Sequence, residues 1–177
     1  NTVKAVKKAG FEAQDIVLQP LAASRAILSD EERDMGVLVI DIGGGTTDYV
    51  VFKEGSLRHT GILSLGGNHV TSDVAYGFKT SIPAAEEIKK RFGCAVADFV
   101  EDDEVVEVPG VGGRPPVLES RRKLAEIIQP RLEEILSLVY QSVEKTGLLD
   151  GLLGGVVLTG GVSLTPYITD LAAAIFN

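Results

Sequence analysis

Two apolar runs on either side of a glycine cluster form the clearest pattern along the chain. The run Val37–Ile40 ends in Asp41, and three glycines and two threonines precede Asp48 and the second run, Tyr49–Phe52. Short apolar runs joined by a glycine-rich turn are typical of a β-hairpin. Because glycine has no side chain, we expect a tip of bare backbone beside hydroxyl and carboxylate groups.

A third apolar run, Val156–Leu158, continues differently. Gly160 and Gly161 follow it, and Pro166 then stands where the first turn of a helix tolerates proline. This order predicts a buried strand, a tight turn and a helix.

Helical spacing of apolar residues and suitable capping residues predict further helices. The segments are Thr2–Ala9, Leu21–Leu28, Val70–Phe78, Pro83–Phe92 and Ser120–Lys145. Asn1 or Thr2 would cap the first helix and Asn68 the third. The last helix carries a long apolar stripe, and Pro130 inside it predicts a kink or a restart.

The remaining segments are shorter and predict strands and turns. Asp15–Leu18 and Gly61–Ser64 are expected to be strands, the first of them buried. Asp30–Asp34 is highly charged and predicts a solvated turn, while Val100–Leu118 predicts a hairpin with an edge strand.

Together these elements indicate an α/β fold with a mixed sheet flanked by helices. We expect residues Asn1–Gly67 and Thr146–Asn177 to form this larger part. A small α+β subdomain, Asn68–Lys145, would be inserted between its two halves.

Composition narrows the classes of function. The net charge of −8 argues against non-specific binding of nucleic acid. No apolar run approaches the roughly 20 residues of a membrane span, and the first residues show no signal-peptide pattern. The one cysteine, Cys94, cannot form an internal disulfide, suits a reducing cytoplasm and is expected to be a small core residue.

The glycine cluster has the composition of a phosphate-binding loop. The N–H groups of Gly43, Gly44 and Gly45 could approach a phosphate closely, and Thr46 and Thr47 would add hydroxyl donors. Asp41 could hold Mg²⁺ through water, because that ion keeps most of its water shell. An ordinary hairpin is the alternative, but its turn needs only one or two glycines and no flanking carboxylates.

The segment VLVIDIGGGTTDYVVF resembles the second phosphate motif of the actin-like ATPases, which include actin, sugar kinases and heat-shock chaperones. The segment GVVLTGGVSLTPYITDLAAAIF resembles the adenosine motif of that superfamily, and the two motifs stand in the family order. This resemblance implies an actin-like ATPase lobe, which is a ribonuclease H-like fold.

Two further segments, LRHTGILSLGGNHVTSDVA and AEEIKKRFGCA, resemble the bacterial cell-division FtsA proteins in particular. A third, QPLAASRAIL, resembles the connecting strand-to-helix turn that is shared across the superfamily. The family's first phosphate motif, the small subdomain of its N-terminal half and its C-terminal amphipathic membrane helix are not found in this sequence. The chain therefore resembles the C-terminal lobe of an FtsA protein, with subdomains of the 2A and 2B types.

The resemblance implies ATP or ADP with Mg²⁺ as the ligand. The loop from Gly43 to Thr47 would then cradle the β- and γ-phosphates, and Gly66 and Gly67 would let a second turn approach them. Gly160, Gly161 and Val162 would form a flat floor against adenine or ribose, where a Cβ at either glycine would collide. Glu86, Lys89 and Lys90 match positions that face adenine and ribose in the superfamily, although a surface ion-pair face explains their spacing equally well.

Three other polar residues near these motifs are assigned structural roles. Asp48 is expected to be an acceptor within the hairpin rather than a catalytic base. His59 and His69 are expected to be hydrogen-bonded polar residues, because no partner at metal-ligand spacing accompanies them.

The resemblance also implies protein partners. FtsA proteins link the tubulin-like ring protein FtsZ to the inner face of the cytoplasmic membrane at the division site, recruit later division proteins and form actin-like filaments. A groove beside the long apolar stripe would bind the FtsZ C-terminal tail through Arg121, Arg122, Lys123 and Arg131. Alternatively, these are solvated helix residues, since cations at a helix N-terminus oppose its dipole.

Other members of the superfamily remain alternatives. A type IV pilus assembly protein of the PilM type shares the fold, but Arg58–Thr60 and Gly66–His69 favour FtsA. A sugar kinase would need an acid or base from the absent lobe, and no peptide-binding domain of a chaperone is visible. Since part of the catalytic set lies in that absent lobe, we expect this chain alone to hydrolyse ATP negligibly.

Overall fold

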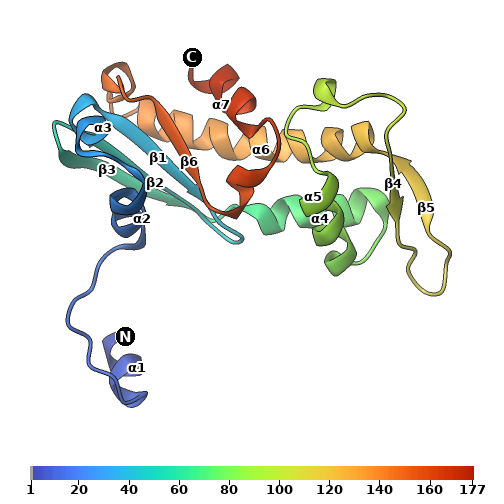
Figure 1. Cartoon of the computed structure of the whole chain (residues 1–177), viewed down its shortest axis with the longest axis horizontal. Helices are drawn as coiled ribbons and strands as arrows, with labels where there is room; N and C mark the ends of the chain where they lie inside the picture. The colour runs from blue at the N-terminus through green and yellow to red at the C-terminus, as the bar shows by residue number, and fades with distance from the viewer. Residues whose placement is uncertain (1) are drawn as a thin grey trace.

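A computed structural model describes residues 2–177. Figure 1 shows an elongated molecule with a sheet at one end and a helical part at the other. The helix α6 (Arg121–Glu144) runs alongside both parts, while α1 (Thr2–Lys8) stands apart from the body. The expected helix near the N-terminus is confirmed, and the proposed cap at Asn1 lies outside the described residues.

Four strands form the main sheet in the order β3-β2-β1-β6. The strands β1 (Val37–Ile42) and β2 (Thr47–Lys53) form the predicted hairpin, and β3 (Ser56–Leu63) extends it on the antiparallel side. The strand β6 (Val156–Thr159) pairs in parallel with β1, so that Asp41 lies opposite Thr159. The mixed sheet is therefore confirmed. The strand β3 is longer than the predicted strand Gly61–Ser64.

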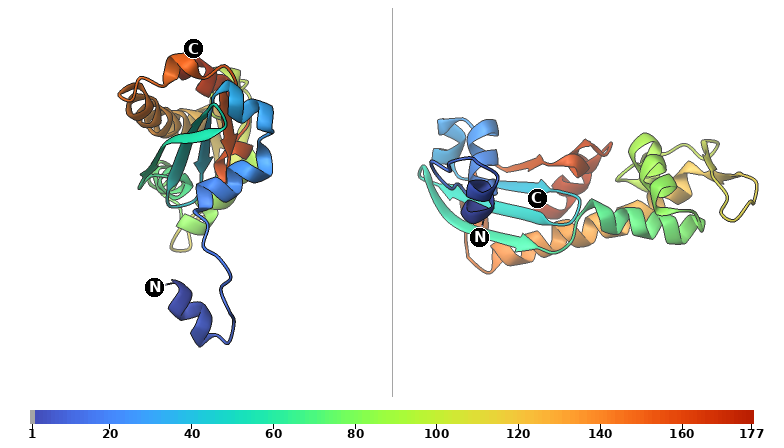
Figure 2. Two further views of the ribbon diagram at one scale, coloured as in Figure 1. Left: turned by 90° about the vertical axis from the view of Figure 1, so that its left-hand side faces the viewer. Right: turned by 90° about the horizontal axis from the view of Figure 1, so that it is seen from below.

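Both faces of this sheet are covered, which explains why β1 is apolar at consecutive positions. Leu38, Ile40 and Ile42 belong to a core cluster that includes residues of α6 and of α7 (Ile168–Phe176). Val37 and Val39 belong to a second cluster with Leu21 and Leu28 at α2 (Gln19–Ile27). Figure 2 shows α2 and α6 on opposite sides of the sheet.

The long helix α6 continues through Pro130 as one helix of 24 residues. Of the predicted kink or restart at this position, the restart does not occur and the kink stays a prediction. Proline costs about 3 kcal/mol within a helix, but apolar side chains are buried on both sides of it and outweigh that cost. They are Leu124, Ala125, Ile128, Leu132, Ile135, Leu136, Val139 and Val143.

The second part of the molecule contains α4 (Gly67–Phe78), α5 (Ile82–Phe92) and the predicted hairpin of β4 (Val105–Val108) and β5 (Val117–Ser120). Single 3-10 turns lie at η1 (Ala97–Phe99), η2 (Leu149–Gly151) and η3 (Gly161–Leu164). One apolar cluster extends from the sheet into this part. The division into two subdomains at Gly67 and Thr146 stays a prediction.

Two predicted elements near the N-terminus are wrong. Asp15–Leu18 is not a strand, because this segment pairs with no strand of the sheet and its apolar side chains are more than half exposed. Asp30–Asp34 is not a turn but part of α3 (Asp30–Met35). Ser29 and Glu32 form a reciprocal capping box there. This serine–glutamate spacing is a helix-start signal, which the high charge of the segment led us to overlook.

The expected cap of α4 is also wrong. The helix begins earlier, its N-cap is Gly66, and Asn68 lies within its first turn. The ring atom Nδ1 of His69 accepts the N–H of Gly66 at 3.1 Å and supplies the cap instead. Within residues 2–177, no helix is both long enough and apolar enough to cross a membrane.

Candidate functional site

A cavity of about 430 Å³ lies where the two parts of the molecule meet. Its walls come from the tip of the β1–β2 hairpin, the start of α4, one side of α5, the middle of α6 and the segment around η3. The residues that line it are Gly43, Gly44, Gly67, Asn68, Val70, Glu86, Lys89, Lys90, Ile128, Leu132, Gly161, Val162, Leu164, Thr165 and Pro166. Both sequence motifs therefore contribute to one cavity of the size that small ligands occupy.

The glycine loop lines the cavity through Gly43 and Gly44 but not through Gly45 and Thr46, and it carries unpaired backbone donors. The N–H of Gly43 closes the turn by donating to the carbonyl of Thr46 at 2.9 Å. The N–H groups of Gly44, Gly45 and Thr46 donate no hydrogen bond to any residue in the range 2–177. Successive free N–H groups in a tight turn form a concavity that favours an anion.

The start of α4 holds this loop in place. The N–H of Gly67 donates to the carbonyl of Gly43 at 2.9 Å, and the N–H of Asn68 donates to Gly44 at 2.7 Å. A Cβ at Gly66 would lie 2.6 Å from the carbonyl oxygen of Gly43, so glycine is required there. Since the first donors of the helix are already used, the free donors for an anion are those of the loop itself.

The two threonines of the loop have structural partners. Thr47 is fully buried and donates its hydroxyl to the carbonyl of Leu65 at 2.9 Å, which ties the hairpin to the segment before α4. Thr46 donates to Asp48 at 3.1 Å. Asp48 is therefore the expected acceptor within the hairpin, whereas the hydroxyl of Thr47 is committed away from the cavity.

Asp41 lies at the end of β1 and does not line the cavity itself. Its Oδ2 accepts from Nε2 of Gln19 at 3.4 Å, and a Cβ at Gly160 would lie 2.5 Å from its Oδ1. Gly160 also has a φ of 86°, which favours glycine. Residues 2–177 contain no cluster of three potential metal ligands, but one carboxylate beside a phosphate loop fits Mg²⁺ bound through water.

Charged side chains of α5 line another part of the cavity. Glu86 is paired with Lys89 at 2.6 Å and with Lys90 at 3.1 Å. Burial alone would raise the pKa of Glu86, but hydrogen bonds from Lys89, Thr71 and Lys90 together lower it to about 2. These residues are therefore ion-paired and also line the cavity, while their contact with adenine or ribose stays a prediction.

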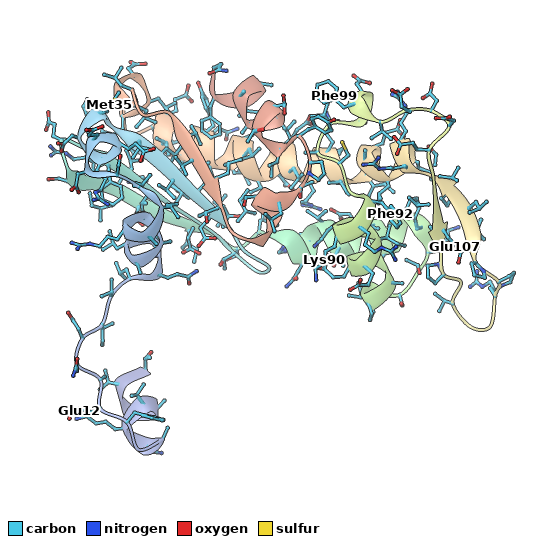
Figure 3. The ribbon with its side chains drawn as sticks, viewed as in Figure 1. Glu12, Met35, Lys90, Phe92, Phe99 and Glu107 are labelled. Carbon is cyan, nitrogen blue, oxygen red and sulfur yellow. The ribbon has the colours of Figure 1, made fainter. Side chains whose placement is uncertain are left out.

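The two lysines differ in exposure. The side chain of Lys89 is 15% exposed, and its Nζ donates to the carbonyl of Gly67 at 3.0 Å. The side chain of Lys90, labelled in Figure 3, is 61% exposed. Lys90 is thus the lysine that can move toward a ligand, while Lys89 is held between the helices.

The turn after β6 supplies part of the cavity wall. Gly161 and Val162 line the cavity, whereas Gly160 packs against Asp41. A Cβ at Gly161 would meet nothing within 4 Å in the protein, so the expected collision there could come only from a ligand. Sequence reasoning did not predict the remaining lining residues, which are Asn68, Val70, Ile128, Leu132, Leu164, Thr165 and Pro166.

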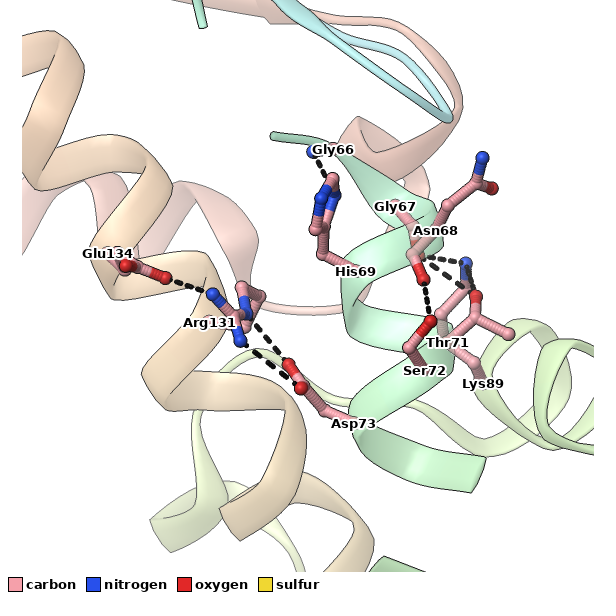
Figure 4. A network of polar contacts seen from close by, with 10 residues as sticks. All are labelled: Gly66, Gly67, Asn68, His69, Thr71, Ser72, Asp73, Lys89, Arg131 and Glu134. Carbon is pink, nitrogen blue, oxygen red and sulfur yellow. Dashed lines mark hydrogen bonds and ion pairs between the residues drawn. The ribbon is translucent and has the colours of Figure 1, made fainter. Parts of the chain in front are cut away.

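The four cations predicted to bind a partner are all paired with carboxylates of the chain. Their partners are Glu104 for Arg121, Asp98 and Asp102 for Arg122, Glu119 for Lys123, and Asp73 and Glu134 for Arg131. The Arg131 contacts are drawn in Figure 4. A peptide bound there would have to replace or share these carboxylates.

The two histidines have different environments. His69 is hydrogen-bonded, as expected. The buried Nε2 of His59 has no hydrogen-bond partner within residues 2–177, so that expectation is wrong for this residue. Its aromatic neighbour Tyr49, 5.9 Å away between ring centroids, has its hydroxyl bonded to Ser142 at 2.6 Å. Cys94 is buried, as expected.

Comparison with known proteins identifies the family. A family model described as "Cell division protein FtsA" matches residues 38–177. FtsA of Pseudomonas aeruginosa is 42% identical over the whole chain, and FtsA of Escherichia coli strain K12 is 44% identical over 184 aligned positions. The chain belongs to the FtsA family of cell division proteins and spans 42% and 44% of the length of these two relatives.

The fold has a counterpart among solved structures. MreB 5 of Spiroplasma citri, in a crystal structure bound to AMPPNP, superposes with a TM-score of 0.84 at 24% sequence identity. The match covers 99% of this chain and 56% of the MreB 5 chain. It confirms the actin-like lobe at the level of the fold.

Proposed function

We propose that this FtsA-family chain binds ATP or ADP with Mg²⁺ in the cavity between its two parts. The observation that carries the proposal is the row of free N–H groups at Gly44, Gly45 and Thr46, on a loop fixed by the start of α4. The AMPPNP bound to MreB 5, which has the same fold, supports a nucleotide as the ligand.

The charges at the two ends of the cavity support one orientation of the nucleotide. Phosphates would lie at the glycine loop, where backbone donors favour negative charge and Asp41 can hold Mg²⁺ through water. Glu86 carries a negative charge at neutral pH because its pKa is about 2. It would repel phosphate and accept hydrogen bonds from ribose hydroxyls, with adenine between Lys90 and the wall at Gly161 and Val162.

Calorimetric titration of the chain with Mg·ATP tests this proposal. Gly45→Val is the control variant, because its Cβ would meet nothing within 4 Å in the protein and so would obstruct only a ligand. Obstruction of the phosphate donors should weaken binding at least about tenfold, which corresponds to about 1.4 kcal/mol. Failure of the wild-type chain to bind, or equal binding by the variant, would contradict the proposal.

We further propose that the chain alone hydrolyses ATP negligibly. Phosphoryl transfer requires a positioned water and metal in addition to phosphate donors, and the chain spans less than half of its FtsA relatives. Phosphate release should therefore not exceed that of Gly45→Val. Turnover clearly above this control would overturn the proposal.

In the full-length protein, we propose the adaptor role of the family. Such a protein would link FtsZ to the cytoplasmic membrane, recruit later division proteins and assemble into actin-like filaments. Membrane attachment would use the C-terminal amphipathic helix of the family. Family membership supports this role, and the division of the chain into 2A-type and 2B-type subdomains belongs to the same proposal.

The proposed surface for the FtsZ tail contains Arg121, Arg122, Lys123 and Arg131. An acidic tail would compete with the exposed carboxylates, such as Asp98 and Asp102, that now pair with Arg122. Fluorescence anisotropy of a labelled tail peptide should show weaker binding by Arg122→Glu and Arg131→Glu, with a scrambled peptide as control. Arg131→Lys should retain binding, and unchanged affinity in both reversals would exclude this surface.

A further inference from the structure

We propose that Thr71 is a positioning residue that fixes the ribose-facing side chains of the nucleotide site. The inference rests on the proposed function, because it concerns how Glu86 and Lys89 are held for a nucleotide. Thr71 lies in α4, is 3% exposed and is one of only three buried polar side chains among the described residues. It lies within the FtsA-like segment at residues 57–75 but was not among the predicted site residues.

The hydroxyl of Thr71 is the centre of a small network between α4 and α5. Its Oγ1 accepts from Nζ of Lys89 at 2.8 Å. Its single proton can go to the carbonyl of Gly67, 2.9 Å away, or to Oε2 of Glu86, which is also in hydrogen-bond contact. Figure 4 shows Thr71, Lys89 and Gly67 together at the start of α4.

This arrangement exceeds what a helical threonine needs for itself. A threonine within a helix can satisfy its hydroxyl on the carbonyl four residues earlier, and Gly67 is that residue here. The additional partners, Glu86 and Lys89, come from the neighbouring helix and both line the cavity. Long side chains lose rotamer freedom when they are fixed, so a buried hydroxyl that holds them in advance lowers the cost of binding.

The network also joins the two ends of the site. The carbonyl of Gly67 accepts from Lys89, while its N–H donates to Gly43 of the glycine loop. With Oε2 of Glu86 held by Thr71 and Lys89, Oε1 faces only the exposed Lys90 and is the oxygen left for a ligand. Thr71 should therefore set how strongly the site distinguishes a nucleotide by its ribose hydroxyls.

The test compares Thr71→Val, which has the same shape without the hydroxyl, with Thr71→Ser, which keeps it. Calorimetry of the wild-type chain should show tighter binding of ATP than of 2′-deoxy-ATP or 3′-deoxy-ATP, by about tenfold for the hydroxyl that Glu86 accepts. In Thr71→Val this ratio should fall to within about threefold of unity, and in Thr71→Ser it should stay near the wild-type value.

The outcomes separate this inference from the proposed function. Absence of ATP binding by the wild-type chain would overturn the proposed function and the inference with it. ATP binding with the same ratio in Thr71→Val as in the wild type would overturn the inference alone. A general loss of structure in Thr71→Val would weaken the binding of all three nucleotides by the same factor. The ratio of their affinities would then stay at the wild-type value, which counts against the positioning role.

Discussion

The two ends of the cavity that we propose to bind a nucleotide are built in different ways. At the proposed phosphate end, the donors are backbone N–H groups of a glycine loop held by Gly67 and Asn68. At the proposed ribose end, the polar groups are the long side chains of Glu86, Lys89 and Lys90, held by ion pairs and by Thr71. At Gly66 the backbone of the loop leaves no room for an added atom, whereas the other end depends on where hydrogen bonds and ion pairs hold long side chains.

The largest effect is expected when one methyl group is added beside the glycine loop. In Gly66→Ala the Cβ would lie 2.6 and 2.8 Å from the carbonyl oxygens of Gly43 and Gly44. Because both contacts are with backbone, the loop must shift, at a cost of about 2–3 kcal/mol in the free energy of unfolding. Chemical denaturation measures this cost.

Gly45→Ala is the matched control for that variant. Its Cβ would meet nothing within 4 Å, so the free energy of unfolding should change by less than about 0.5 kcal/mol. Equal stability of Gly66→Ala and Gly45→Ala would show that the contact between the loop and α4 is not the constraint described here.

A comparison of the two lysines tests the ribose end. Lys89→Met removes a largely buried ammonium with three partners and should destabilise the chain by about 1–2 kcal/mol. Lys90→Met removes an exposed ammonium with one partner and should cost less than about 0.5 kcal/mol. Thermal and denaturant unfolding measure the stability of the two variants. A larger loss of stability in Lys90→Met than in Lys89→Met would mean that Lys90 is the structural residue.

The smallest expected effect is the contribution of Glu86 to the pH dependence of the free energy of unfolding. Its pKa in the folded chain is about 2, below the reference value of 4.5, so the unfolded chain binds more protons between these two pH values. The stabilisation is therefore fully present above pH 4.5 and is lost as the pH falls toward 2. We expect a loss of about 1 kcal/mol after allowance for solvent screening.

Glu86→Gln provides the reference for this measurement. Denaturant unfolding at a series of pH values should show a shallower decline for the variant than for the wild-type chain between pH 4.5 and 2. Parallel curves would mean that the carboxylate is not held by Lys89, Thr71 and Lys90 in the way described.

Sequence reasoning succeeded where the signal was local and failed where it depended on a distant partner. The hairpin around Gly43–Gly45 and the turn at Gly160 were predicted because glycine position and apolar runs specify them directly. The strand at Asp15–Leu18 was wrong because four apolar residues do not reveal whether a neighbouring strand exists. The restart at Pro130 was wrong because burial along α6 outweighed a local rule.

The sequence by itself determined the phosphate loop, the two glycine turns, the helix that carries Glu86 and the family of the chain. These features lie in contiguous segments whose backbone requirements are visible residue by residue. Only the tertiary structure decided that Lys89 is largely buried and Lys90 exposed, that Thr47 donates to Leu65, and that Thr71 joins α4 to α5. Burial and hydrogen-bond partners are properties of packed neighbours, and a single residue acquires them only when the chain brings distant segments together.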